Sequence, residues 1–290
     1  MRLVLVHGRD QQGKSSESLK EVWKEALDVG LSQAGLTSVD THEIHLPYYG
    51  DALESAVQKI RASSISDIMT KGATPAQTHI EAFQVELLQE LLSDQNLTYC
   101  EPGAPIQKGL QNTTVAHLLA KLADNSPWNK ELLAVATGDV AAYLNSVTIE
   151  KQINAIVESE IPREVPCVVV GHSLGSIVAY RVLRKLGKSA DVVRFITLGS
   201  PLGLKAIRNV LRPLSVPAGV RSWLNVYDTR DIVALRPLDE STWNVLPAIK
   251  NIALDNNHMA NRHGISGYLD YVDVATAVFE ALNSVSGERN

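Results

Sequence analysis

The sequence has few of the features that mark several large classes of protein. Its 290 residues include only two cysteines, Cys100 and Cys167, so no framework of disulfide bonds is implied. Cys167 lies inside the apolar run VPCVVV and is interpreted as a small buried side chain. The net charge of -5 lacks the basic excess with which nucleic-acid-binding proteins neutralise phosphates. We therefore set nucleic acid aside as a partner.

Long apolar runs, internal repeats and low-complexity segments are also absent from the sequence. Only four apolar residues separate Arg2 from His7, too few for a secretory signal. No uncharged apolar segment approaches the length of about 18 residues that a membrane-spanning helix needs. We expect a chain without a membrane span, located in the cytoplasm.

What is present is an alternation of short apolar runs with helical patterns, which predicts an α/β fold with a mainly parallel central sheet flanked by helices. A final helix is expected from about Ile265 to Leu282. The expected strands are RLVLVH (2–7), VDTHEIHLP (39–47), VPCVVV (165–170), VVRFITLG (192–199), RSWLNVYD (221–228) and a late strand near IKNIAL (249–254).

Residues 51–160 interrupt this alternation. They contain almost no β-rich runs but several amphipathic helical patterns, such as the one through Phe83, Leu87 and Leu91. The segment is far longer than the 2 to 6 residues of an ordinary strand-to-helix loop. We expect residues 1–50 and 161–290 to form the core and residues 51–160 to form a mainly helical cap or insertion.

Two motifs with different chemistry follow predicted strands. Gly8, Gly13, Lys14 and Ser15 complete G-x-x-x-x-G-K-[ST], the spacing of a phosphate-binding loop. The segment Gly171 to Gly175 is G-x-S-x-G between a β-branched run and a helix, which is typical of a nucleophile elbow around Ser173. The glycines are expected because a sharp strand-to-helix turn leaves no room for side chains two positions either side of the serine.

Each motif also has a simpler interpretation. The phosphate-loop spacing is the rarer of the two by chance, so pattern rarity alone favours the nucleotide interpretation. Ser173 at the start of a helix is also compatible with an ordinary N-cap. Residues elsewhere in the chain have to decide between these interpretations.

A phosphate loop needs an acidic residue at the end of another apolar strand to hold Mg²⁺. The runs VPCVVV and VVRFITLG do not end in one, and only NVYD offers an Asp. A serine nucleophile instead needs an acid and then a histidine later in the chain. Asp228 and Asp231 follow a predicted strand, and His258 and His263 precede the last helix, so both partners are present in that order.

These segments together resemble the α/β-hydrolase family, in particular its bacterial lipase- and esterase-like members. The resemblance covers most of the chain and is carried by LVHG, GHSLGS, NVYDTRDIVAL and HGISGYL. In that family a D-P-V-A-like segment carries the acid, and DIVA matches it at Asp231 with Ile232 in place of Pro. The resemblance implies His263 as the base, while Asp228 stays open as the alternative acid.

The resemblance also implies an oxyanion hole made by two main-chain N–H groups. The residue after the first His-Gly pair supplies one, which is Arg9 here, and the residue after the nucleophile supplies the other, which is Leu174. His7 and His172 are interpreted as structural. On this interpretation the phosphate-loop spacing is coincidental.

We therefore expect a serine hydrolase with catalytic Ser173, Asp231 and His263, needing no metal or organic cofactor. The expected substrates are carboxylic esters, including lipid esters whose acyl chain the helical segment shelters. A peptidase or amidase would use the same residues. A catalytically silent module on the same fold, which binds a protein partner through the helical segment, and a nucleotide-binding protein are the alternatives from other classes.

Overall fold

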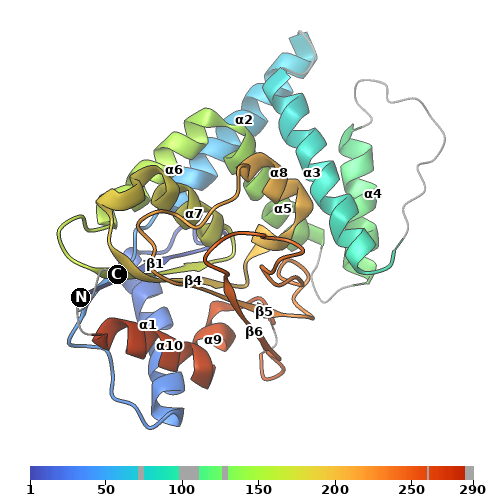
Figure 1. Ribbon diagram of the computed structural model, residues 1–290. Coiled ribbons are helices and arrows are strands. Elements are labelled where there is room, and N and C mark those ends of the chain that lie inside the picture. Colours follow the sequence, from blue (N-terminus) through green and yellow to red (C-terminus); the bar gives the residue numbers. More distant parts are fainter. Residues whose placement is uncertain (71–74, 98–110, 126–129, 260, 285–290) are drawn as a thin grey trace. The chain divides into compact units, whose positions relative to one another are not determined.

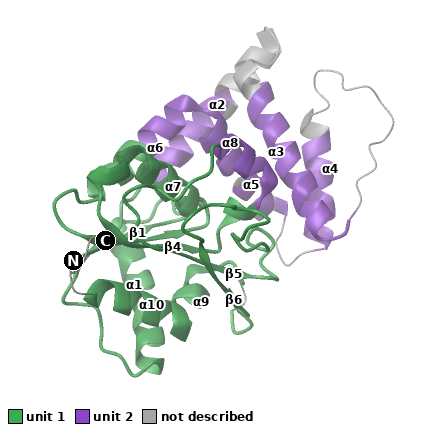
Figure 2. Cartoon of the chain, in the orientation of Figure 1, with its two compact units in different colours: residues 1–49, 154–203, 213–290 green, residues 50–153, 204–212 purple. Residues whose placement is uncertain are grey.

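The computed structural model describes residues 1–70, 75–97, 111–125, 130–259 and 261–284 (Figure 1). The chain forms two compact units, one of residues 1–49, 154–203 and 213–290 and the other of residues 50–153 and 204–212 (Figure 2). Residues 154–160 thus belong to the first unit, and residues 204–212, from the second half of the chain, belong to the second.

The first unit is an α/β fold with a six-stranded parallel sheet in the order β2-β1-β3-β4-β5-β6. Parallel pairing brings the carboxyl ends of the strands to one edge, where the loops of an open α/β sheet build binding sites. The strands are β1 (Arg2–Val6), β2 (Glu43–His45), β3 (Cys167–His172), β4 (Val192–Leu198), β5 (Trp223–Asp228) and β6 (Lys250–Leu254).

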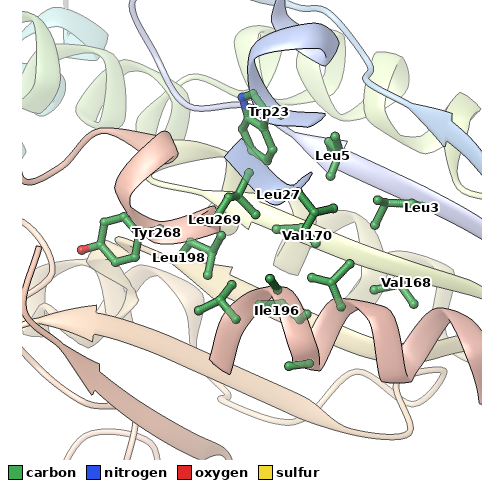
Figure 3. Close-up of a cluster of buried hydrophobic side chains, with 14 of the residues drawn as sticks. Leu3, Leu5, Trp23, Leu27, Val168, Val170, Ile196, Leu198, Tyr268 and Leu269 are labelled. Atoms are coloured by element: carbon green, nitrogen blue, oxygen red, sulfur yellow. The ribbon is translucent and has the colours of Figure 1, made fainter. Parts of the chain in front are cut away.

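Both faces of the central strands are covered. Helices α1 (Ser16–Gln33), α9 (Ile265–Leu269) and α10 (Val272–Asn283) pack on one face. Alternate strand residues such as Leu3, Val168 and Ile196 point into that layer, as the two-residue period of a strand requires (Figure 3). Helix α7 (Leu174–Leu186) packs against β3 and β1, and an aromatic cluster fills its side of the sheet: Tyr180, Phe195, Trp223 and Trp243.

Two elements differ from the sequence prediction. The strand expected over residues 39–47 is reduced to β2, because it lies at the sheet edge, pairs only with β1, and is preceded by a turn in which His42 N–H donates to the Val39 carbonyl. The expected final helix is split into α9 and α10. Its apolar pattern continues across the break, but Tyr271 has an extended backbone (φ −72°, ψ 126°).

The second unit is helical within its described residues. Its helices are α2 (Gly50–Thr70), α3 (Pro75–Asp94), α4 (Gln111–Asp124), α5 (Lys130–Asn145) and α8 (Lys205–Leu211), while α6 (Val147–Glu160) passes from this unit into the first. Glu90 of α3 accepts hydrogen bonds from the amides of Lys205 and Ala206, which satisfies two free N–H groups at the start of α8. Among the described helices, none combines the length and apolar character required to cross a membrane.

Candidate active site

Ser173 occupies a strained turn between β3 and α7. Its φ of 53° and ψ of −128° lie in a region that L-residues rarely adopt. A Cβ on Gly171 would lie 2.8 Å from the Cα of Ser176, and one on Gly175 would overlap the carbonyl oxygens of Val6 and His7. The crowding expected from the sequence is therefore present, and it explains the glycines on both sides of the serine.

Ser173 does not act as an ordinary helix cap. It stands at the N-cap position of α7, yet its side chain makes no capping hydrogen bond. The hydroxyl instead lies 2.8 Å from Nε2 of His263, which belongs to the loop between β6 and α9. The two residues are 90 positions apart in sequence, so only the folded sheet edge brings them together.

The other ring nitrogen of His263 is held by Asp231. Nδ1 lies 2.6 Å from Asp231 Oδ2, at a site where both side chains are almost completely buried. Because an ionised carboxylate can only accept, this contact assigns the proton to Nδ1 and leaves the Nε2 lone pair facing Ser173. Ser173, His263 and Asp231 thus form a continuous hydrogen-bonded chain.

The two candidate aspartates have different surroundings. Asp228, at the end of β5, accepts hydrogen bonds from the amides of Arg230 and Asn256 and from Nη1 of Arg262. These bonds tie the end of β5 to the loop that carries His263. Of the two aspartates, only Asp231 contacts the imidazole. Asp228 instead holds the loop that carries His263.

His258, the second candidate histidine, lies outside this chain of hydrogen bonds. Its side chain is about half exposed, and its Nε2 lies 2.8 Å from Asp270 Oδ2. An exposed contact of this kind contributes little to stability. His263 is the histidine that the fold brings to the serine.

The loop after β1 lies directly against Ser173. A Cβ built on Gly8 would be 3.0 Å from the Cβ of Ser173 and 3.3 Å from Nδ1 of His172. The Gly8 carbonyl and the main-chain N–H of Arg9 belong to one peptide bond. Leu174 is the first residue of α7, and first-turn amides have no acceptor within their own helix.

The buried His7 holds this peptide unit in place. Its Nε2 accepts the N–H of Tyr49 at 3.1 Å, which leaves the ring proton on Nδ1 to be donated to the Gly8 carbonyl at 2.6 Å. Because a trans peptide points its C=O and N–H in opposite directions, fixing the Gly8 oxygen also fixes the direction of the Arg9 N–H. Burial lowers the pKa of His7 to about 4, so the ring is neutral near pH 7.

A second buried histidine, His172, supports His263. Its Nε2 donates a hydrogen bond to the main-chain carbonyl of His263 at 2.8 Å. Burial, followed by the proximity of His263, holds the pKa of His172 well below its usual value. His7 and His172 were interpreted from sequence as structural, and each hydrogen-bonds main-chain atoms of the candidate site.

One contact at the site was missed from the sequence. The hydroxyl of Tyr268, in α9, donates to Asp231 Oδ2 at 2.8 Å. Tyr268 was included only within the expected final helix. Its signal in the sequence is weak, because a tyrosine five residues after a histidine is equally typical of a helix that packs on a core.

The phosphate-loop residues have local roles. The Ser15 hydroxyl accepts the N–H of Ser18 and caps α1, and Lys14 Nζ donates to Gln11 Oε1 at 3.0 Å. Across the part of the chain that the structure describes, no cluster of three or more His, Cys, Asp or Glu side chains could hold a metal ion.

Comparison with known proteins gives no match: no family model fits the sequence, and no curated protein and no solved structure matches the chain.

Proposed function

We propose that the chain is a serine hydrolase of the α/β-hydrolase type, which cleaves carboxylic esters through an acyl-enzyme intermediate. The observation that supports this proposal is the chain of hydrogen bonds from Asp231 through His263 to Ser173, at the carboxyl edge of a parallel sheet. A nucleophile bonded to a base, with the base oriented by a third group, is the arrangement that acyl transfer requires.

The proposed reaction follows from this geometry. The Ser173 oxygen attacks the ester carbonyl carbon while its proton passes to His263 Nε2. The resulting imidazolium is stabilised by Asp231, and the oxyanion accepts hydrogen bonds from the N–H groups of Arg9 and Leu174. The C–O bond of the ester then breaks, and His263 returns the proton to the departing alcohol. Water repeats the sequence on the acyl-serine and releases the carboxylic acid.

Covalent labelling tests the proposal. A fluorophosphonate should label wild-type protein at Ser173, identified by mass spectrometry of the labelled peptide, and Ser173→Ala should abolish labelling. Turnover of p-nitrophenyl esters should fall by roughly 10⁴-fold or more in that variant. Ser222→Ala, which removes a hydroxyl bonded to the Val193 carbonyl, is the matched control. Undiminished turnover in Ser173→Ala would refute the mechanism.

Further comparisons separate the remaining alternatives. A catalytically silent module would fold normally, by circular dichroism, and show neither labelling nor turnover. Ester and p-nitroanilide substrates with the same acyl group distinguish an esterase from an amidase, and a series of acyl-chain lengths tests for lipid esters.

His263→Ala should abolish turnover, whereas His258→Ala should leave it within about tenfold, because the exposed His258 is bonded to Asp270 rather than to the serine.

A further inference from the structure

Tyr268 joins the apolar core to the candidate site. Its ring belongs to the buried cluster beneath the sheet and is completely inaccessible to solvent. In Figure 3 the ring lies beside Leu198 and Leu269, while the hydroxyl oxygen points away from these aliphatic side chains. That hydroxyl donates to Asp231 Oδ2 at 2.8 Å. The core therefore fixes a hydroxyl group in a single position against the carboxylate.

Asp231 is a buried carboxylate held by three different donors. Oδ2 accepts both the phenol of Tyr268 and Nδ1–H of His263, and Oδ1 accepts the N–H of Val233 at 3.2 Å. A buried carboxylate is costly unless its oxygens are hydrogen-bonded, and bonds to a charged acceptor are the stronger ones. Tyr268 and His263 therefore act on the same oxygen atom.

The phenol of Tyr268 is a permanent donor. Burial, together with the negative charge of Asp231, holds its pKa well above the usual value. Its proton therefore stays in place near neutral pH, and the phenol remains the donor of the hydrogen bond.

We propose that Tyr268 is a positioning residue for acyl transfer, which aims Asp231 Oδ2 at His263 and keeps the shared proton on the imidazole. This inference rests on the proposed function. When the proton of Ser173 moves to His263 Nε2, the ring becomes an imidazolium and Asp231 remains a carboxylate. The phenol weakens the basicity of Oδ2, so the Nδ1 proton is not lost to the carboxylate, and Tyr268 keeps its own proton throughout.

Several other charged or titratable groups surround this cluster. They are His172 at the end of β3, Asp228 at the end of β5, Arg262 next to His263, and His7 and Arg9 at the end of β1. Of these groups, Asp228 also interacts with Tyr268 and contributes to its raised pKa. The comparison in an Asp231→Asn background, rather than the pH profile alone, therefore assigns an effect to the bond between Tyr268 and Asp231.

The test is Tyr268→Phe, which keeps the ring in the core and removes only the hydroxyl. The measurement is the rate constant of fluorophosphonate labelling at Ser173 as a function of pH. We expect it to fall about tenfold on the plateau, because the carboxylate is less well oriented. The acidic limb of the pH–rate profile should move to higher pH by about half to one unit. Without the phenol the Asp231 carboxylate loses one of its donors, which favours the protonated imidazole beside it over the neutral one. Tyr271→Phe, at the edge of the same core, is the control and should leave rate and profile unchanged.

A second measurement separates positioning from a merely structural role. In an Asp231→Asn background, Tyr268→Phe should change the labelling rate by less than about twofold, since the phenol acts through the carboxylate. Equal losses in both backgrounds, or an unchanged rate and pH profile in Tyr268→Phe alone, would overturn the inference. If wild-type protein were not labelled at Ser173, the proposed function itself would fail, which is a different result.

Discussion

Gly8 faces Ser173 so closely that a Cβ at the glycine position would lie 3.0 Å from the Cβ of the serine. This contact joins the first strand of the sheet to the turn after β3, which follows it in sequence by more than 150 residues. The absence of a side chain at Gly8 lets the Gly8–Arg9 peptide approach the serine. That approach is required if the Arg9 N–H is to reach an oxyanion on a substrate bound to Ser173.

The first prediction concerns this approach. Gly8→Ala should lower kcat for p-nitrophenyl esters by at least about tenfold, because the added methyl group pushes the loop away from the position of the oxyanion. Steady-state kinetics measure the effect. Gln12→Ala, an exposed position in the same loop, should leave kcat unchanged. An unaltered kcat in Gly8→Ala would exclude this loop from the oxyanion hole.

The second prediction concerns the two aspartates. Asp231→Asn should lower turnover by about 10⁴-fold, because the amide no longer holds the correct tautomer of His263. Asp228→Asn should keep turnover within about tenfold, since Asp228 does not contact the imidazole. Asp228→Asn should instead lower the melting temperature, because Arg262 and the amides of Arg230 and Asn256 lose the negatively charged acceptor of their hydrogen bonds. If the two variants exchanged these phenotypes, the assignment of the acid would be wrong.

The third prediction concerns the phosphate-loop spacing. Titration calorimetry with ATP or GTP at millimolar Mg²⁺ should show no saturable binding, because the Ser15 hydroxyl caps α1 and Lys14 is bonded to Gln11. If the proposed mechanism holds, Lys14→Ala should retain esterase activity within about tenfold, since the group that the mechanism uses at this loop is the main-chain N–H of Arg9. Micromolar nucleotide binding that disappears in Lys14→Ala would support the nucleotide interpretation instead.

The fourth prediction concerns stability and pH. Burial lowers the pKa of His7 from 6.5 to about 4. Above pH 6.5 the ring is neutral in both the folded and the unfolded chain, so it adds no pH dependence. As the pH falls from 6.5 towards 4, the unfolded chain binds a proton that the folded chain does not, and stability is lost. His172, whose pKa is also lowered, acts in the same direction.

For His7 alone the free energy of unfolding should fall by about 2 kcal/mol between pH 6.5 and pH 5. Urea unfolding, followed by tryptophan fluorescence between pH 7 and pH 5, measures the slope. His7→Gln should reduce the decline by about that amount, whereas His258→Gln, at an exposed position, should not. A slope unchanged by His7→Gln would mean that His7 is protonated in the folded protein.

The interior strands were predictable because both of their faces are buried. β3 and β4 appear in the sequence as runs rich in β-branched and other apolar residues, interrupted in β4 by Arg194, and the structure has them within two residues of the expected ranges. The edge strand β2 was overestimated, since flanking residues with the same local pattern have no neighbouring strand to pair with. The break between α9 and α10 was missed because the apolar pattern crosses it unchanged.

By itself, the sequence determined the alternation of strands and helices and the sharp turn at Ser173, because a strand, two glycines, a serine and a helix lie within about twenty consecutive residues. The resemblance of DIVA and HGISGYL to α/β-hydrolase segments favoured Asp231 and His263, but Asp228 stayed open as the alternative acid, because the two aspartates lie at the end of the same strand and just past it. Only the tertiary structure decided which of them meet, because hydrogen bonds form at 2.6 to 2.8 Å while these residues are 32 and 90 positions apart. The contact of Tyr268 with Asp231 has the same origin, because helix packing on the sheet, and not local sequence, turns its hydroxyl towards the site.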